Sequence, residues 1–392
     1  MSNIRVNAIT DEAGTGAPDF PNGYTVAGAA PAGPFSYAAV SGATQALDVG
    51  AHNFFDADTL TADTTISFTN VPTEAQWTYT AKAGASEGYT LTSATYASLS
   101  KNVISQDSSP YDVAFSSDGT KMFVAGRVNN TVYQYTLSTA WDVSTATYAS
   151  LSKSVAAQDS GLASVAFSSD GTKMFVLGTQ LNTVYQYTLS TAWNVSTATY
   201  ASLSKSVAAQ DSYSSGIAFS PDGTKMFMVG RFNQNVSQYT LSTAWNVSTA
   251  TYASLSKNVI SQETDPFAVA FSSDGTKMFV VGRTSDTVYQ YTLGTAWNVS
   301  TATYASLSKS VAAQGGSPFG LAFSSDGTKM FVVDGVNTSV YQYNTAIVAT
   351  LTTPASVQNP PSEVYYADSQ VAYTFFTADA GTTVKLINEQ VL

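Results

Sequence analysis

The chain has 392 residues, of which only 11% are charged, and its formal net charge is −11. This acidic balance opposes the attraction to phosphate that nucleic-acid binding requires, and the absence of cysteine excludes disulfides, thiolate catalysis and Cys-ligated metals. No stretch reaches the roughly 18 apolar residues of a membrane span, so membrane insertion is not expected. The many aromatic and small polar residues favour an all-β protein.

Residues 1–42 are rich in Gly, Pro and Ala, which predicts an extended arm with little core of its own. The arm begins without the apolar segment of a secretory signal peptide, so export by that route is not expected. Residues 43–92 contain alternating apolar segments separated by turn residues, which predict β-strands. This segment is short for a stable core of its own.

A ten-residue word, FSSDGTKMFV in its first copy, recurs every 52 residues, and its copies begin at Phe115, Phe167, Phe219, Phe271 and Phe323. Each unit predicts four strands, which in the first copy span 112–117, 120–126, 131–137 and 147–153. Asp118-Gly119 is a strong hairpin signal between the first two, because both residues tolerate positive φ. Four antiparallel strands repeated at a fixed period predict the blades of a β-propeller.

The ends of the repeat region predict how the propeller closes. The fifth copy stops at Asn344 without its fourth strand, whereas an extra copy of that strand, TYASLSK, stands at 95–101 before any first strand. Together they complete a blade, so we expect a five-bladed propeller over residues 93–344 that is closed by its N-terminal strand. An open solenoid would need capping units, and none is visible.

The units resemble bacterial propeller repeats of the YVTN and NHL type, through VAFSSDGTKMFVVG at 269–282 followed by TVYQYTL at 287–293. This resemblance implies the fold but says little about activity, because such propellers serve as lectins, scaffolds and enzymes.

The copies differ mainly in two windows, one before the first strand and one between the second and third strands, and both emerge at the same end of a blade. Loops on a rigid scaffold commonly carry binding sites, and arginines beside aromatic rings suit a glycan or a protein epitope. Unconstrained drift is the alternative. The candidate ligand-binding residues are Tyr111, Arg127, Asn129, Tyr213, Arg231, Phe232, Phe267, Arg283, Asp286 and Phe319.

One tryptophan per unit lies in the nearly invariant connection between the third and fourth strands. These residues are the alternative sugar-stacking set, Trp141, Trp193, Trp245 and Trp297. The favoured interpretation is that each packs its connection beneath the blade.

The residues of most catalytic designs are missing from the repeats. The single histidine, His52, precedes them, which rules out a Ser-His-Asp triad or a His-rich metal site in the propeller. Paired carboxylates serve glycosidases, but the candidates occupy positions that do not repeat, and none lies in an apolar setting that would raise its pKa. We therefore expect no catalytic residue, metal or cofactor, and no enzyme; a glycosidase is the minor alternative. The candidate carboxylates are Asp112, Asp265, Asp286 and Asp334.

Residues 345–392 predict several more strands. Because closure brings the two ends of the propeller together, we expect the propeller to be inserted into a β-sandwich built from residues 43–92 and 345–392. Two independent small domains are the alternative.

Three flanking motifs resemble virion proteins of tailed bacteriophages, in particular tail-fibre or appendage proteins: ITDEAGTGAPDFPNG at 9–23, NFFDADTLTADTTISFTNVPTEAQWTY at 53–79 and YTFFTADAGTTVKLI at 373–387. The resemblance implies an arm that attaches to other virion proteins, a homo-oligomer, with a trimer favoured, and exposure on a particle assembled in the host cytoplasm. We expect a non-enzymatic structural protein whose propeller binds a host-surface glycan or protein. The alternatives are a capsid or tail decoration protein, and a multivalent lectin or scaffold not associated with virions.

Overall fold

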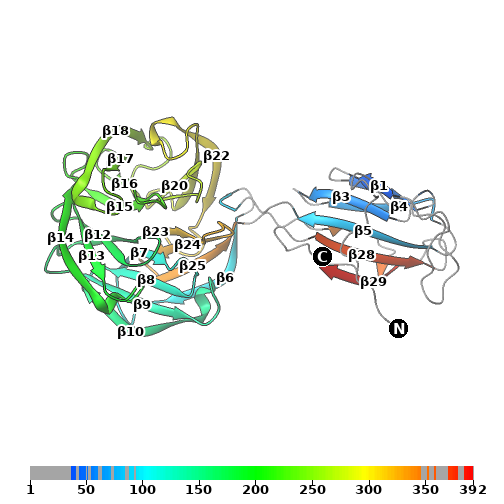
Figure 1. The fold of residues 1–392 in the computed structure, drawn as a ribbon, viewed down its shortest axis with the longest axis horizontal. Helices are drawn as coiled ribbons and strands as arrows, with labels where there is room; N and C mark the ends of the chain where they lie inside the picture. The colour runs from blue at the N-terminus through cyan, green and yellow to red at the C-terminus, as the bar shows by residue number, and fades with distance from the viewer. Residues whose placement is uncertain are drawn as a thin grey trace. The chain divides into compact units, whose positions relative to one another are not determined.

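The computed structural model describes the repeat region almost continuously and the flanks in pieces. The described residues are 37–40, 44–49, 51, 54–60, 64–71, 75–83, 88–91, 94–345, 351–352, 357–358, 370–377 and 384–391. The chain divides into two compact units, one over Gly88–Ala346 and one that combines Met1–Glu87 with Ile347–Leu392 (Figure 1). Most of the predicted arm, residues 1–36, lies outside the described residues. In the described ranges, no helix is long and apolar enough to cross a bilayer.

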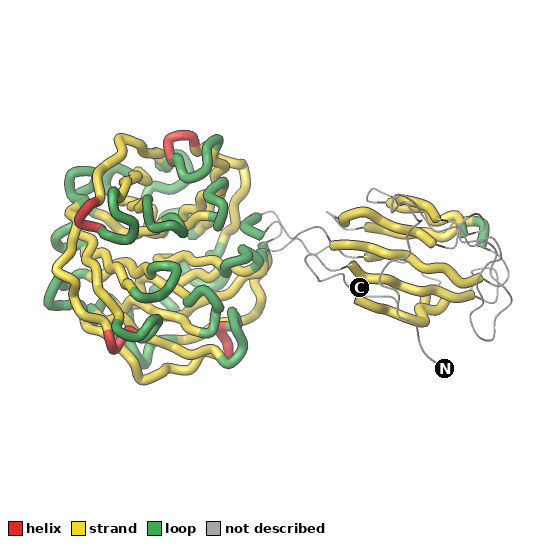
Figure 2. The backbone as a smooth tube through the Cα atoms, in the orientation of Figure 1, coloured by secondary structure: helices red, strands yellow, loops and turns green. Residues whose placement is uncertain are grey.

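The unit over Gly88–Ala346 is the predicted five-bladed propeller, with four antiparallel strands in each blade (Figures 1 and 2). The blades are β7 (Pro110–Phe115), β8 (Lys121–Gly126), β9 (Thr131–Leu137) and β10 (Ala146–Ser154); β11 (Leu162–Phe167), β12 (Lys173–Gly178), β13 (Thr183–Leu189) and β14 (Ala198–Ser206); β15 (Ser214–Phe219), β16 (Lys225–Gly230), β17 (Asn235–Leu241) and β18 (Ala250–Asn258); β19 (Pro266–Phe271), β20 (Lys277–Gly282), β21 (Thr287–Leu293) and β22 (Ala302–Ser310); and β23 (Pro318–Phe323), β24 (Lys329–Asp334), β25 (Ser339–Asn344) and β6 (Thr95–Asn102). The innermost strands contact one another in a closed ring, β7–β11–β15–β19–β23–β7.

Single 3-10 turns interrupt four of the connections between the third and fourth strands: η1 (Val143–Thr145), η2 (Val195–Thr197), η3 (Val247–Thr249) and η4 (Val299–Thr301) (Figure 2). Each begins after an Asp or Asn whose side chain accepts a hydrogen bond from the backbone N–H two residues on, as Asp142 does from Ser144 at 3.0 Å. This local bond explains the [DN]-V-S-T sequence of the connection, because it satisfies a donor that the short helix leaves free.

The first two strands of each blade are joined at the predicted Asp-Gly pair, but by a longer loop than a two-residue hairpin. Gly119 has φ +69, whereas Asp118 keeps a negative φ and instead accepts hydrogen bonds from Ser116 Oγ at 2.6 Å and Thr120 N at 3.0 Å. These bonds hold the pKa of the Asp118 carboxyl low, at about 2. The repeated aspartates are thus turn-forming residues, as their sequence suggested.

The apolar second strands form the centre of the packing. In β8, Met122, Phe123, Val124 and Ala125 are all buried, and Phe123 contacts Phe167 of the next blade with ring centroids 4.3 Å apart. The equivalent ring contacts recur from blade to blade, for example between Phe227 and Phe271 at 4.3 Å. Each second strand therefore buries both of its faces against neighbouring blades, which is why its sequence lacks the alternation of a half-exposed strand.

The N-terminal strand closes the ring, as predicted. β25 pairs with β6 in the same antiparallel register that joins the third and fourth strands elsewhere. The closing segment begins at Gly88, earlier than the expected residue 93, because Tyr89 takes the place that a tryptophan has in the other blades. Tyr89 has φ +64 and its N–H donates to Gly327 O at 2.7 Å, as Trp141 N–H donates to Gly119 O at 3.0 Å.

The second unit is built from both flanks, as the sandwich prediction requires. One sheet has the order β1 (Tyr37–Val40), β3 (Phe54–Leu60), β5 (Ala75–Ala83), β28 (Gln370–Thr377), β29 (Val384–Val391), β27 (Val357–Gln358), and the other has the order β2 (Thr44–Asp48), β4 (Thr64–Thr69), β26 (Leu351–Thr352). Buried Trp77 of β5 packs edge-on against Phe68 of β4 at 4.9 Å, and Tyr79 Oη of β5 donates to Gln45 of β2 at 3.0 Å. These contacts join the two sheets.

In every blade a buried carboxylate accepts hydrogen bonds from the two loops at one end. In four blades the acid lies in the loop before the first strand, whereas in the fifth blade it ends the second strand. In the first blade Asp107 accepts hydrogen bonds from Ser109 N at 2.9 Å and Asn129 N at 3.0 Å, and it lies against Gly126, whose absent Cβ would be 2.5 Å from the carboxyl carbon. In the fifth blade the two positions are exchanged. Gly315 replaces the acid and Asp334 replaces the glycine.

The exchange preserves the hydrogen bonds. Asp334 accepts from Ser317 N at 2.9 Å and Asn337 N at 2.7 Å, the counterparts of the two donors to Asp107. A side chain at Gly315 would approach the Asp334 carboxyl carbon to 2.0 Å, so only one of the two positions can carry the acid. Each blade therefore needs one carboxylate, whichever strand provides it.

We expect Asp334→Gly to lower the free energy of unfolding by about 2–4 kcal/mol, because it leaves two loop N–H groups without an acceptor. The exchange variant Gly315→Asp/Asp334→Gly rebuilds the arrangement of the other blades and should recover most of that loss. Urea denaturation of the three proteins measures the differences. An exchange variant no more stable than Asp334→Gly would contradict the equivalence of the two positions.

Candidate functional site

The two variable windows of each blade lie together at one end of the propeller, which we call the variable end. It comprises residues 103–112 and 127–130 with their equivalents in the other blades. A backbone hydrogen bond joins the windows in every blade, as from Arg127 N to Ser109 O at 3.0 Å. The opposite, constant end carries the Asp-Gly turns and the tryptophan connections, which are joined by bonds such as Trp141 N to Gly119 O.

Three of the predicted aromatic residues meet at the propeller axis. Tyr111 stacks on Phe319 with centroids 4.5 Å apart, Phe319 contacts Phe267 at 4.6 Å, and Tyr111 lies 6.0 Å from Phe267. Tyr111 and Phe267 belong to blades that are not neighbours, so their contact places this cluster over the axis. Phe267 is only 3% exposed, whereas Tyr111 and Phe319 are half-buried, so the cluster packs over the axis at the variable end and keeps part of its surface in solvent.

Two of the predicted arginines join neighbouring blades. Arg231 lies over the rings of Phe267 and Tyr213, at 4.1 and 4.6 Å, and pairs with Asp265 of the next blade through two hydrogen bonds. Arg127 lies 4.7 Å over Tyr111 and donates to Thr179 Oγ1 of the next blade at 3.1 Å. Both guanidinium groups already have partners that suit them, which leaves them less free for a ligand than their sequence suggested.

The third arginine and the remaining predicted polar residues differ in exposure. Arg283 pairs with Asp265 at 3.0 Å, but its side chain stays 47% exposed. Asn129 is an exposed loop residue whose side-chain amide donates to Gln106 O and Tyr133 Oη. Asp286 has a buried Oδ1 with no hydrogen-bond partner among the described residues, and burial, with Asp334 and Glu263 nearby, raises the pKa of its carboxyl.

Most of the large hydrophobic side chains that are exposed among the described residues lie at the variable end. The described residues include nine large hydrophobic side chains that are exposed. Seven of these belong to the variable end and none belongs to the constant end. The other two, Tyr200 and Tyr252, lie on outer strands. The seven are Ile104, Val128, Leu181, Tyr213, Phe232, Ile260 and Val336, with Phe232 the most exposed at 69%. Of the predicted ligand-binding residues, Tyr213 and Phe232 belong to this apolar rim.

The tryptophans pack their own connections and form no exposed stacking platform. Trp141 is half-buried and lies on Gly119, where a Cβ would approach its ring to 2.3 Å, and it also stacks on Phe331 of the neighbouring blade. Trp193, Trp245 and Trp297 make the same contacts with their own turn glycines and neighbouring phenylalanines.

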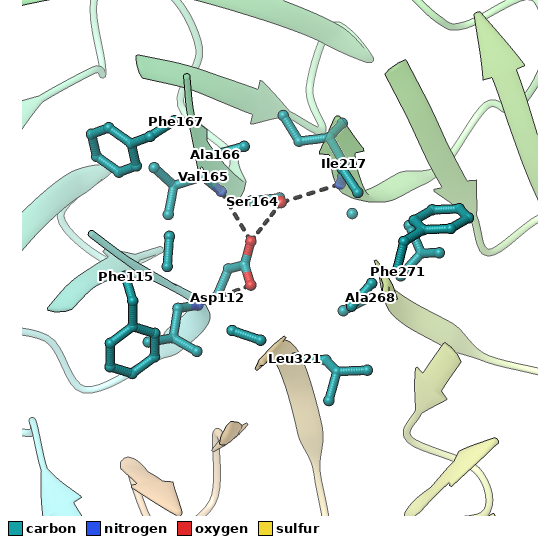
Figure 3. Close-up of a pocket in the computed structure, with 17 residues that line it drawn as sticks. Asp112, Phe115, Ser164, Val165, Ala166, Phe167, Ile217, Ala268, Phe271 and Leu321 are labelled. Atoms are coloured by element: carbon teal, nitrogen blue, oxygen red, sulfur yellow. Dashed lines mark hydrogen bonds between the residues drawn. The ribbon is translucent and has the colours of Figure 1, made fainter. Parts of the chain in front are cut away.

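Asp112 is the functional candidate that the sequence interpretation misjudged. It lines a cavity of about 220 Å³ on the axis, among side chains of the five innermost strands (Figure 3). Burial raises the pKa of its carboxyl from 3.8 to about 7, although Ser164 Oγ, Val165 N and Val113 N all donate hydrogen bonds to it. The statement that no aspartate lies in an apolar setting was therefore wrong. A shifted pKa inside a cavity is a common property of functional sites.

Two of the other candidate carboxylates, Asp265 and Asp334, have structural partners, whereas Asp286 has the unpartnered Oδ1 described above. Asp265 pairs with two arginines, and Asp334 binds the loop N–H groups of its own blade. His52 lies outside the described residues. Among the described residues, no group of three or more His, Cys, Asp or Glu side chains is arranged to hold a metal ion.

Comparison with known proteins relates the repeats to one enzyme family. Residues 139–296 match a family model described as "Lactonase, 7-bladed beta-propeller". No curated protein matches the chain. Two solved structures described as "putative 6-phosphogluconolactonase" are similar. The one from Bacteroides uniformis is 14% identical over 59% of this chain and 65% of that chain, with a TM-score of 0.39. The one from Bacteroides fragilis is 16% identical over 52% of this chain and 55% of that chain, with a TM-score of 0.36. The chain thus spans less than two thirds of either.

These comparisons correct two expectations. The expectation that the protein is not an enzyme was wrong, because the repeats match a lactonase family. The comparisons also contain nothing that indicates a phage tail-fibre protein, and the lactonase match argues against a phage structural role. They support a β-propeller whose repeats resemble those of the lactonase family. The propeller of this protein has five blades.

The raised pKa of Asp112 predicts that the free energy of unfolding falls as the pH rises from about 4 to about 7. In that window the folded protein holds a proton on Asp112 that the unfolded chain releases, so each pH step favours unfolding. Asp112→Asn removes this dependence and should be more stable than the wild type at pH 8 by about 2–4 kcal/mol, since one pKa unit is worth about 1.4 kcal/mol.

Urea denaturation of both proteins between pH 4 and 8 measures the difference, in which the contribution of His52 cancels. Asp118→Asn is the matched control. Its carboxyl has a lowered pKa, so its removal should cost stability at neutral pH, and this cost should shrink as the pH falls from about 4 through 2. Parallel pH profiles for the wild type and Asp112→Asn would disprove the assignment.

Proposed function

We propose that the propeller is a recognition module that binds a protein partner at its variable end. The observation that carries this proposal is the uneven placement of large exposed apolar side chains: of the nine in the part of the chain that the structure describes, seven lie at the variable end and none at the constant end. Water-exposed apolar groups gathered on one face are typical of interaction surfaces. The strands beneath are fixed by packing between blades, so little conformational entropy is lost when the loops bind.

The chemistry of this apolar rim favours a protein over a glycan. Sugars are bound by exposed aromatic faces beside free hydrogen-bonding groups, but Tyr111, Phe267 and Phe319 contact one another, and Arg127 and Arg231 already have hydrogen-bond partners. The exposed positions are mostly aliphatic, such as Leu181 and Val336. Aliphatic side chains around a few aromatic ones, Phe232 and Tyr213, suit the apolar core of a protein interface.

A narrower hypothesis makes the partner a host-surface receptor and the protein a homo-oligomeric appendage of a phage virion. Its support is the set of flanking motifs, such as residues 373–387, and the construction of the second unit from both flanks. A decoration protein that stabilises the particle has the same support. The lactonase match weighs against both. Immunogold labelling of purified particles from a producing culture tests them, and absence of label would remove the virion hypothesis while leaving recognition intact.

A second candidate function is hydrolysis of a lactone in the axial cavity, with Asp112 as the general base. The lactonase match and the near-neutral pKa of this buried carboxyl favour it. In a pH-stat assay at pH 8 with a simple δ-lactone, Asp112→Asn should then be slower by about 100-fold or more, the usual loss on removing a general base. Equal rates for the two proteins would exclude this role.

For recognition, the test variant is Leu181→Ser/Phe232→Ser/Val336→Ser, which removes the apolar character of three loop tips. Their side chains are 61%, 69% and 67% exposed, so the free energy of unfolding should change little. The full chain is panned against a displayed peptide library and, in parallel, applied to a glycan array. The wild type should enrich a peptide motif, and the variant should bind the selected peptides at least tenfold more weakly.

Tyr200→Ser/Tyr252→Ser is the matched control, because these tyrosines are exposed on outer strands away from the variable end. This control should bind like the wild type. Enrichment of glycans alone, or peptide binding that survives the triple substitution, would contradict the proposal.

A further inference from the structure

The axial cavity has a polar inner end and apolar walls. Four repeated positions of the innermost strands line it, and at three of them each residue seen in the lining is Val, Ile, Leu, Ala or Phe. At the fourth, Asp112 and Ser164 replace the Gly216 and Ala268 of later blades. Of the side chains that line the cavity from β7, β11, β15, β19 and β23, Asp112 alone titrates. Asp112 and Ser164, which lie side by side, are thus the polar exception in an otherwise apolar lining (Figure 3).

Asp112 has hydrogen-bond donors but no compensating positive charge. The influences on its pKa are burial, which raises it, and three hydrogen bonds, which lower it; no Lys or Arg is among them. Its Oδ2 accepts from Ser164 Oγ and Val165 N, whereas Oδ1 accepts from Val113 N only, so Oδ1 keeps a free lone pair. An ionised carboxylate that is 7% exposed and has no cation is costly to bury.

The cavity opens toward the constant end of the propeller. Along β7 the exposure increases from buried Asp112 and Val113 to half-buried Ala114 and Phe115. Phe115 lies three positions after Asp112 on the extended strand, which gives a depth of about 10 Å. Phe115, Phe167 and Phe271 belong to this part of the lining, but their rings point away from the cavity and pack between blades against Phe331, Phe123 and Phe227 (Figure 3). At the other end, Tyr111 and the rings that it contacts cover the axis.

We propose that the axial cavity is a binding site for a small organic cation, a primary ammonium group on a short aliphatic chain. The ammonium group donates to Oδ1 of Asp112 and supplies the missing positive charge, and the chain lies against the Ala and Val walls. A hard metal ion is a poor match, because it requires several oxygen ligands and Asp112 and Ser164 alone supply them from the lining side chains.

This site is independent of the recognition function at the variable end. It differs from the lactone hypothesis in one respect: a carboxylate that holds an ammonium group is not free to act as a base. A ligand of this class would therefore inhibit lactone hydrolysis in the same cavity. Loss of peptide recognition at the apolar rim would leave ammonium binding unchanged.

The test uses the full chain and n-butylammonium as the probe, with n-butanol as its uncharged analogue, in calorimetric titrations at pH 8. Butylammonium should bind at least tenfold more tightly than butanol. Asp112→Asn, which keeps the shape of the side chain, should abolish that preference. Asp118→Asn, the same change at a carboxyl that does not line the cavity, should keep it. Ala218→Leu, which fills the cavity, should bind neither compound.

Two readouts guard against a variant that fails to fold. Wild-type binding should weaken by about 100-fold between pH 8 and pH 5, because the carboxyl is protonated at the lower pH. Carbon-13 spectra of the Asp112 carboxyl should show its pKa falling when butylammonium saturates the protein. Equal affinities for butylammonium and butanol, no binding of either, or an unchanged pKa of Asp112 would each overturn the proposal.

Discussion

The closed ring of innermost strands is the constraint on which the rest of the propeller depends. Each second strand buries both faces, one against each neighbouring blade, as the Phe123–Phe167 and Phe227–Phe271 contacts show. A blade removed from the ring would expose one of these faces, so the five blades are stable only together. Pairing of β25 with β6 makes the last blade equal to the others and leaves the ring without a gap.

This constraint confines sequence variation to positions that the packing does not fix, and even there the variation is compensated. Asn130 and Asn182 accept hydrogen bonds from the first-strand N–H of the next blade, at Leu162 and Ser214. Where proline stands at that strand position and offers no N–H, the loop residue is no longer asparagine: Gln234 precedes Pro266, Asp286 precedes Pro318, and Thr338 precedes Pro110 around the ring. The exchange of Gly315 and Asp334 follows the same logic.

The repeat predicted the fold because a fixed period, a turn signal and an incomplete last unit are all visible in one chain. It did not predict Tyr89 in the place of a tryptophan, since GYTLTSATYASLSK lacks the residue that marks this connection elsewhere. The split second unit was predicted from closure, and the pairing of β5 with β28 decides against two separate domains. Sequence patterns predict where strands lie. Which strands pair with one another follows instead from where the closed propeller brings the two flanks of the chain.

The candidate site was harder to predict for a related reason. The variable windows and their residue types were visible, yet Arg127 and Arg231 contact residues 52 and 34 positions away, which pattern alone does not reveal. Asp112 was recognised as a candidate carboxylate but was not expected to lie in an apolar setting. Its environment is set by five strands from five blades, and only one of its neighbours in the cavity, Val113, is also adjacent in sequence.

The axis and the variable end are two different places to put function on one symmetric scaffold. At the variable end, each blade contributes a separate loop tip, so substitutions such as Phe232 for Val128 change a local contact without disturbing the ring. On the axis, all five blades share one small volume, and a single substitution there changes the environment of every other wall residue. Asp112 is tolerated because Ser164, on the adjacent blade, donates to it while accepting from Ile217 N of the blade beyond. That three-blade chain of hydrogen bonds lets one carboxylate stand in a ring of apolar side chains.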